Sequence, residues 1–251
     1  MINFSIDVNV FIFMKKKFAK KLLKKNRKDY DKLALLYQEK RSQLTPDILY
    51  LKKFAGKGDK ILDLGCGYGR LNEIFKDLDI DYVGTDLSVS QIKLARETYP
   101  DKKFKTSKIL SQPFKDDTFD KVFCLSVIHH IPSTDFKIKF LREIKRILKP
   151  DGKLVLTSWY VWYNPKIRQT MKQLNNKTMK KLDKNDIILP FKDNQGKIIA
   201  NRYIHCFEIK ELKELIGKAG FNIELSKLLT RDRKGENKNI LIVAKNNNSC
   251  F

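Results

Sequence analysis

The sequence predicts an α/β domain with a mostly parallel seven-stranded sheet, helices on both faces and an antiparallel strand pair at its C-terminal end. Short apolar runs alternate with amphipathic segments from residue 60 to residue 159. A glycine-rich turn follows the first apolar run. Two further strand patterns, Phe221–Leu229 and Ile240–Ala244, follow each other across a short charged loop with no helix between them. A length of 251 residues with 42% hydrophobic residues suits one such domain.

The glycine-rich turn is the segment Asp63–Arg70, which follows the apolar run Lys60–Leu62. Its glycines Gly65, Gly67 and Gly69 have the spacing G-x-G-x-G, whereas dinucleotide-binding turns have G-x-G-x-x-G. Such a turn brings a ligand close to backbone N–H groups. Asp63 would repel a pyrophosphate but suits a cationic amino group.

A second acid, Asp86, stands about twenty residues later, at the end of the next apolar run, where a carboxylate can accept two ribose hydroxyls. These residues resemble motif I and the following acidic motif of the Rossmann-like class I methyltransferases. The resemblance implies S-adenosylmethionine, which carries an ammonium group and a ribose but no phosphate. Relatives place an Asp five residues before a Pro-Phe pair to bind adenine, and Lys108 occupies that position here, with Ser107 as a substitute acceptor. The implied cofactor-binding residues are Asp63, Gly65, Cys66, Gly67, Gly69, Asp86, Leu87, Ser107, Lys108 and Ser126.

The other elements follow from hydrophobic periodicity and from Gly and Pro at segment ends. We expect helices over 88–99, 133–148 and 207–219, and strands over 102–106, 119–126 and 153–159. The stretch 161–205 has little strand-like alternation, so we interpret it as an insertion at the carboxyl edge of the sheet, on the substrate side.

The N-terminal part is rich in lysine. Residues 1–13 alternate like a strand, resemble no secretory signal and receive no function. The segment 15–28 predicts a basic helix, which either contacts nucleic acid or is a solvated lead-in. An amphipathic helix over 30–41 follows, and the family resemblance implies that it covers the cofactor. We therefore expect an extension over 1–28 and a methyltransferase domain over 29–251.

The charge balance points to a polyanionic partner. With 52 Lys+Arg against 29 Asp+Glu, the formal net charge is +23. Either an RNA partner or a lysine-rich genome composition explains this excess. The four cysteines form no C-x-x-C pair and no apolar run approaches the ~18 residues of a membrane span, so we expect a cytoplasmic protein without a metal site or membrane contact.

Candidate catalytic residues lie after the fourth and fifth strands. His129 and His130 follow the fourth strand, where either could be functional or merely packed, and we take His129 as the candidate. No Asn-Pro-Pro-Tyr-like stretch or Pro-Cys pair is present, which argues against base-amine and pyrimidine-ring methylation. Val127–His130, Val161-Trp162, Leu189–Phe191 and Arg202–Phe207 resemble the tRNA wobble-uridine carboxymethyl methyltransferases, which include the methyltransferase domain of an AlkB homologue. The Gly-Asn-Trp usual in that family appears here as Gly235–Asn239, without the Trp.

This narrower resemblance implies esterification of a carboxymethyl group on the wobble uridine of tRNA, and relatives often work with a small zinc-binding activator protein. A carboxylate is already anionic at neutral pH, so it needs no general base. A cation must position it, and Arg202 could do so while His205 and Tyr203 orient it. Two alternatives remain: a small-molecule methyltransferase of the quinone-biosynthesis type, and a basic RNA-binding protein with a degenerate methyltransferase fold. Binding of S-adenosylmethionine would distinguish both enzymes from the RNA-binding protein with a degenerate fold. Salt-dependent binding of tRNA would distinguish the tRNA enzyme from the small-molecule methyltransferase.

Overall fold

The computed structural model describes residues 14–40, 43–165, 168–169, 182–232, 235 and 237–247. The strand-like stretch 1–13 and residues 170–181 of the expected insertion lie outside the described residues. Among the helices of the described part, none has the length and apolarity that crossing a membrane requires.

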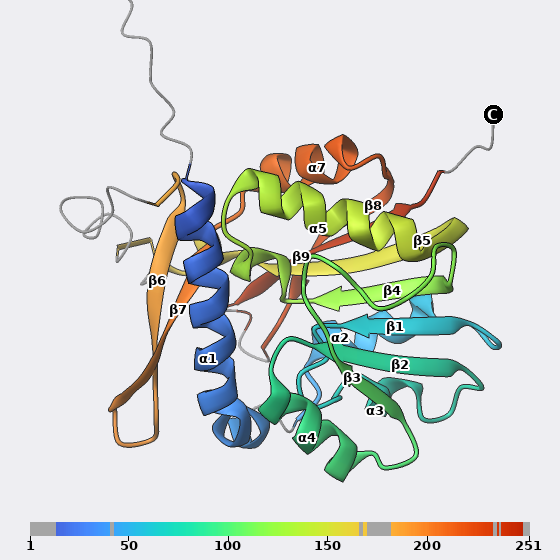
Figure 1. The fold of residues 1–251 in the computed structure, drawn as a ribbon, viewed down its shortest axis with the longest axis horizontal. Helices are drawn as coiled ribbons and strands as arrows, with labels where there is room; N and C mark the ends of the chain where they lie inside the picture. The colour runs from blue at the N-terminus through green and yellow to red at the C-terminus, as the bar shows by residue number, and fades with distance from the viewer. Residues whose placement is uncertain are drawn as a thin grey trace, which may run out of the picture.

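The main sheet has seven strands in the order β3-β2-β1-β4-β5-β9-β8 (Figure 1). Strands β1 to β5 pair in parallel, whereas β9 runs antiparallel to both β5 and β8. This arrangement confirms the predicted fold class, including the antiparallel C-terminal pair. The strands are β1 (Lys60–Leu64), β2 (Asp81–Asp86), β3 (Lys103–Thr106), β4 (Phe119–Leu125), β5 (Leu148–Trp159), β8 (Asn222–Thr230) and β9 (Lys238–Lys245).

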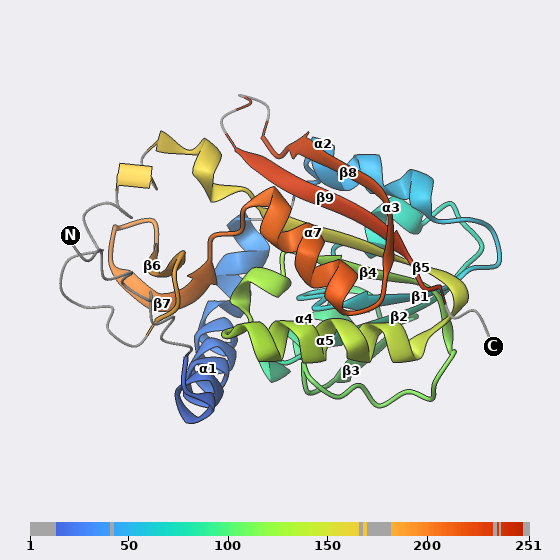
Figure 2. The same cartoon turned by 90° about the horizontal axis from the view of Figure 1, so that it is seen from above.

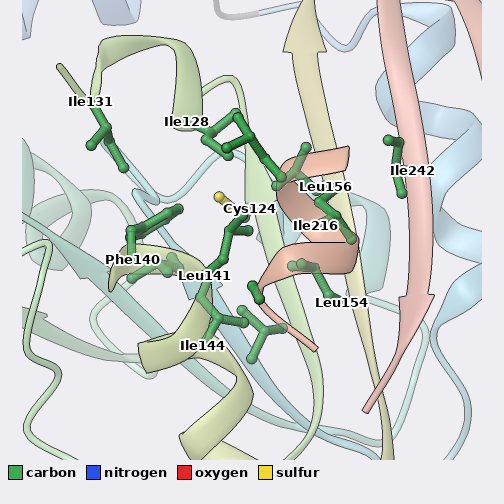
Figure 3. Packing of buried hydrophobic residues seen from close by; sticks show 14 of the residues in the cluster. Cys124, Ile128, Ile131, Phe140, Leu141, Ile144, Leu154, Leu156, Ile216 and Ile242 are labelled. Atoms are coloured by element: carbon green, nitrogen blue, oxygen red, sulfur yellow. The ribbon is translucent and has the colours of Figure 1, made fainter. Parts of the chain in front are cut away.

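Helices cover both faces of the sheet because successive strand residues point to opposite sides. On one face, α5 and α7 pack on the larger core, where Phe140 and Ile144 meet Cys124 and Leu156 (Figures 2 and 3). Cys124 is thus a core residue. The other face is covered by α2, η1, α3 and α4. The helical segments covering the faces are α2 (Pro46–Tyr50), η1 (Leu51–Phe54), α3 (Asn72–Phe75), α4 (Val89–Thr98), α5 (Thr134–Ile147) and α7 (Ile209–Lys218).

Helix α1 (Lys16–Lys40) joins the two helices expected over 15–28 and 30–41 into one. The expected boundary after residue 28 falls inside it, so the described part of the basic segment belongs to the same folded unit. One side of α1 packs on the domain, with Ala19 and Leu22 in the larger core. The opposite side carries the lysine face, which we define as the exposed residues Lys17, Lys20, Lys21, Lys24, Lys28 and Lys32. At ~100° per residue, these six positions fall within an arc of about 120°.

The expected insertion contains a two-stranded antiparallel hairpin, which the sequence reading did not foresee. Its strands are β6 (Asp186–Lys192) and β7 (Ile198–His205), and it lies beside α1 (Figure 1). A short helical turn, η3 (Val161–Tyr163), precedes it. From Arg202 to His205 every residue of β7 is buried: Tyr203 belongs to the larger core, which includes Leu22 of α1, and Ile204 belongs to a small cluster around Trp159. A strand buried on both faces shows no alternation of polar and apolar residues, which explains the missed prediction.

Candidate active site

The glycine-rich turn sits at the carboxyl end of β1, and its backbone is set by β2. The N–H groups of Gly65 and Cys66 both donate to the Thr85 carbonyl, at 2.7 and 3.0 Å. Gly65 has φ +80°, and a Cβ there would lie 2.2 Å from Val127 Cγ2. Only glycine can occupy this position without moving the end of β4.

Asp86 ends β2 and is fixed by two backbone donors. Its Oδ2 accepts from Gly67 N at 2.9 Å and its Oδ1 accepts from Ser88 N at 2.8 Å. Burial raises the pKa of the Asp86 carboxyl, against the lowering effect of these bonds. Each oxygen still has lone pairs for a ligand, so the carboxylate is pre-oriented to accept hydroxyl groups.

Asp63 lies inside β1 and is 2% exposed. The Tyr82 hydroxyl donates to its Oδ2 at 2.8 Å. Burial raises the pKa of this carboxyl to about 7, and the Tyr82 bond acts in the opposite direction. A cationic ligand group beside Asp63 would favour its charged form.

Two adjoining pockets meet at the glycine-rich turn. The first lies under α1, and we call it the α1 pocket. The second lies on the other side of the turn, and we call it the Asp63 pocket. Both are lined by Tyr37, Gly65, Gly67, Leu125 and Ser126. A ligand longer than one pocket can therefore extend across the turn.

The α1 pocket has polar groups on one side and apolar groups on another. Asp86, Leu87 and Ser88 line it from β2 and the start of α4. Leu23, Ile109, Val127 and Ile131 supply an apolar wall. A flat ring system with a hydroxylated sugar matches this division.

Helix α1 is held over this pocket by hydrogen bonds to three other elements. Asp31 accepts from Ser88 Oγ at 2.7 Å, which attaches the helix to α4. Asn26 donates to the His130 carbonyl at 3.0 Å and accepts from Tyr203 N at 3.1 Å. The helix is therefore joined both to the end of β4 and to β7.

His130, rather than the expected His129, faces the α1 pocket. Its Nδ1 lies 2.9 Å from the Tyr203 carbonyl, which can only accept, so Nδ1 carries the proton. Its Nε2 then accepts from the Tyr30 hydroxyl at 2.7 Å. Burial lowers the pKa of His130 to about 3, so the ring is neutral at physiological pH.

His129 is fully buried and lines neither pocket. Its ring centroid lies 4.7 Å from the Trp159 ring, and burial holds its pKa well below the usual range. His130, and not His129, lines the α1 pocket, although both lie on the single turn η2 (Ile128–His130) and their ring centroids are 4.3 Å apart.

Arg202 lies on β7 between two aromatic rings, with its guanidinium carbon 4.9 Å from the Phe191 centroid and 5.4 Å from the Trp159 centroid. It is 5% exposed, and its Nε has no hydrogen-bond partner among the described residues. It also lies close to the Tyr30 hydroxyl: burial and Tyr37 raise the pKa of that hydroxyl, while Arg202 lowers it. Arg202 itself lines neither pocket, but its neighbour Tyr30 does.

Tyr203 and His205 do not join Arg202. Adjacent strand residues point to opposite faces, and these two point into a buried network on the far side of β7. The Tyr203 hydroxyl donates to Asp186 Oδ1 at 2.7 Å. His205 bridges Asp186 and Glu211, with distances of 2.6 Å from Nδ1 and 2.7 Å from Nε2. The expected direct role of Tyr203 and His205 in orienting an acceptor therefore does not match their placement.

The expected cofactor residues divide into two groups. Asp63, Gly65, Cys66, Gly67, Asp86, Leu87 and Ser126 line one pocket or both. Gly69, Ser107 and Lys108 line neither. Ser107 donates to Gln112 Oε1 and Lys108 accepts through its carbonyl from Gln112 Nε2, so both are occupied within their own loop. Ile109, the next residue, lines the α1 pocket in their place.

Gln91 is a pocket residue that sequence reasoning missed. It lines the α1 pocket, is 1% exposed, and neither atom of its amide has a partner among the described residues. Its place on α4, one turn after Asp86, was the only signal available. As for metals, no group of three or more His, Cys, Asp or Glu side chains in the described part could hold an ion.

Residues 62–156, which contain both acids and His130, match the family model described as a methyltransferase domain. The chain is similar to an uncharacterized protein of Methanocaldococcus jannaschii, with 41% identity over 109 residues (43% of this chain, 44% of that protein). It is also similar to the tRNA (carboxymethyluridine(34)-5-O)-methyltransferase ALKBH8 of Mus musculus, with 27% identity over 160 residues (63% of this chain, 23% of that protein). A third relative is the 2-methyl-6-phytyl-1,4-hydroquinone methyltransferase of Synechocystis, with 33% identity over 130 residues (46% and 40%). The chain thus spans less than half the length of these curated relatives.

Two solved structures share the fold. A SAM-dependent methyltransferase of Methanosarcina mazei superposes with a TM-score of 0.67 at 21% identity, covering 81% of this chain and 98% of that chain. A putative methyltransferase of Haloferax volcanii, solved in complex with the Trm112 methyltransferase activator, gives a TM-score of 0.61 at 18% identity, covering 86% and 96%. Both likenesses extend well beyond the segment 62–156.

Proposed function

We propose that the S-adenosylmethionine-dependent methyltransferase domain of this chain esterifies a carboxymethyl group on the wobble uridine of a tRNA. The name of the Mus musculus relative specifies this chemistry, and similarity to it extends over 63% of the present chain. The observation on this chain that carries the proposal is Arg202, a buried cation next to the pocket wall.

The residues of the two pockets fit S-adenosylmethionine. Asp86 can accept the ribose hydroxyls, and the apolar wall of the α1 pocket suits adenine. The Asp63 pocket suits the amino-acid tail, because it offers the Asp63 carboxylate to the ammonium and the arginines Arg70 and Arg231 to the carboxylate. When bound, the cofactor supplies a methyl group on a positively charged sulfur.

A carboxylate acceptor fits an α1 pocket whose histidine, His130, is not a base near neutral pKa. The carboxylate is already anionic, so the protein must position it and exclude water. His130 accepts from Tyr30 and has a pKa of about 3, so it is not arranged to remove a proton from an acceptor. Arg202 supplies the complementary charge, and its unpartnered Nε–H can donate to a carboxylate oxygen.

The lysine face supports a nucleic-acid partner. Its six lysines cover the exposed side of the helix whose other residues line the α1 pocket, so they can bind phosphates on the outside of that helix. The formal net charge of +23 favours the same kind of partner. A small activator protein is a second proposed partner, supported by the Haloferax volcanii complex of the same fold.

Nucleoside mass spectrometry of tRNA tests this proposal. A strain lacking the gene should accumulate the free carboxymethyl nucleoside and lose its methyl ester. In vitro, Arg202→Met should lower turnover efficiency ~30- to 1000-fold, the scale of a lost desolvated charge pair, whereas His129→Ala, behind the pocket, should be much milder. Arg202→Lys, which keeps the charge without the planar fork, is the matched control and should fall between the two. Cofactor affinity should not change in any of the three.

A hydroquinone acceptor is the second candidate, favoured by the similarity to the Synechocystis enzyme and by the apolar wall of the α1 pocket. A hydroxyl acceptor must lose a proton, so activity would rise with pH through the neutral range. Three results together would assign the chain to the hydroquinone methyltransferases instead. Arg202→Met would have a mild effect, activity would rise with pH through the neutral range, and the tRNA nucleosides of the deletion strain would be unchanged.

A further inference from the structure

The Asp63 pocket also contains two polar side chains that are hydrogen-bonded to each other and that the family resemblance does not account for. Asp47 lies in the first turn of α2 and Asn239 near the start of β9, where it is paired with Trp159. Asn239 Nδ2 donates to Asp47 Oδ2 at 2.6 Å. Both side chains line the pocket together with Asp63. Asn239 stands in the segment where the resembled family has its Trp.

Each member of the pair has one oxygen left over. Asp47 is 5% exposed and Asn239 is 2% exposed, yet Asp47 Oδ1 and Asn239 Oδ1 have no hydrogen-bond partner among the described residues. Leaving a buried acceptor without a donor is unfavourable, and more so for a charged one. Two such oxygens beside one pocket therefore point to a ligand that brings donors.

The chemistry of the pocket selects the kind of donor. Asp47, Asn239 and Asp63 together present three side chains that accept through oxygen, two of them carboxyls. A primary ammonium group has three N–H donors and a positive charge, and it matches this set. The proposed cofactor carries one such group, at the end of its amino-acid tail.

We propose that Asp47 and Asn239 bind the ammonium group of the cofactor's amino-acid tail, so that Asp63 shares this role with a second acid. The inference rests on the cofactor in the proposed function and not on the tRNA acceptor. Arg70 and Arg231 line the same pocket, so the tail's carboxylate also has complementary charge within reach. The tail is thereby held by groups from β1, α2 and β9 at once.

Calorimetry with two adenosine ligands tests the inference. S-adenosylhomocysteine carries the amino-acid tail, whereas 5′-methylthioadenosine lacks it and probes the adenosine site alone. Asp47→Asn, which keeps shape but removes charge, should weaken S-adenosylhomocysteine about 10- to 100-fold and leave 5′-methylthioadenosine within about twofold. Asn239→Leu should show the same selectivity. Asp86→Asn, at the ribose, is the matched control and should weaken both ligands.

Retained 5′-methylthioadenosine binding also shows that each variant is folded. Equal losses for both ligands, or no loss for either, would overturn the inference. Normal S-adenosylhomocysteine binding combined with loss of methyl transfer would assign the pair to the acceptor instead and would equally overturn it. The two binding measurements use no tRNA, so their outcome is separate from that of the wobble-uridine proposal.

Discussion

Replacing His130 by Asn should change how the stability of the folded chain depends on pH. The Asn amide can still donate to the Tyr203 carbonyl, but the variant has no titrating ring at this position. In the wild type, burial holds the pKa of His130 at about 3, against 6.5 for an exposed histidine. Between these values the unfolded chain binds a proton that the folded chain does not. The folded state therefore loses stability as the pH falls through 6.5.

The size of this loss follows from linkage. With 1.36 kcal/mol for each pH unit of difference, acidification from pH 7 to pH 5 should destabilise the wild type by about 2 kcal/mol through His130. The contribution of Asp63 to the pH dependence of stability has the opposite sign. Burial raises its pKa from 3.8 to about 7, so between these values the folded chain binds a proton that the unfolded chain does not. Its contribution over the same interval is a gain of about 2 kcal/mol. The two nearly cancel in the wild type, so only comparison with variants separates them.

Urea unfolding at pH 7 and pH 5, without cofactor, measures the effect. The free energy of unfolding of the wild type should fall by about 2 kcal/mol more than that of His130→Asn. Asp63→Asn is the matched control: it removes the compensating acid, so this variant should fall by about 2 kcal/mol more than the wild type. If the free energy of unfolding changed equally with pH in the wild type and in His130→Asn, His130 would have the same pKa in the folded and in the unfolded chain. The ring would then not be the buried, neutral acceptor that holds Tyr30 of α1.

Three further predictions concern the ligands. Asp86→Ala should weaken S-adenosylmethionine binding by about 1–3 kcal/mol in calorimetry, because the ribose loses a charged acceptor; unchanged affinity would remove Asp86 from the site. Gln91→Met should weaken the same binding by about 1 kcal/mol without loss of thermal stability, because the amide has no partner in the described protein; a stability loss with normal affinity would give Gln91 a structural role. Replacing lysines of the lysine face by Gln should flatten the plot of log tRNA affinity against log salt by about 0.9 for each duplex phosphate that the variant no longer neutralises, measured by fluorescence anisotropy; an unchanged slope would place the RNA elsewhere. The lysines to replace are Lys17, Lys21, Lys24 and Lys28.

The sheet and the placement of Asp63 and Asp86 beside the pockets could be predicted because local signals determine them. Strand–turn–helix repeats fix the parallel order, and the acids Asp63 and Asp86 follow from their positions at the ends of β1 and β2. Ser88, the first residue of the helix expected over 88–99, caps α4 by accepting from Gln91 N. Each of these features depends on residues within one turn or one strand.

The acceptor side could not be predicted in the same way, because it depends on packing between distant segments. His130 is held at the α1 pocket by a hydrogen bond to Tyr30, which lies 100 residues earlier in the sequence. The orientation of β7 is set by packing on both of its faces, so the sequence could not show that Arg202 and Tyr203 separate. Ile109 rather than Lys108 lines the α1 pocket, in a loop where Gln112 Nε2 donates to the carbonyl of Lys108. No periodicity encodes any of these three outcomes.

Successive side chains of β7 point to opposite faces of the hairpin, and this limits how the region can change in length during evolution. The turn 193–197 is exposed, and Gly196 has open space around its Cβ position, so residues can be added or removed there without disturbing the strand ends. A single deletion between Ile198 and Arg202 has a different result, because it exchanges the two faces of everything beyond it. The arginine would enter the network of Asp186, and the tyrosine would take its place beside Trp159. Natural length variants should therefore collect in the turn, whereas β7 keeps its residue count or changes it by two.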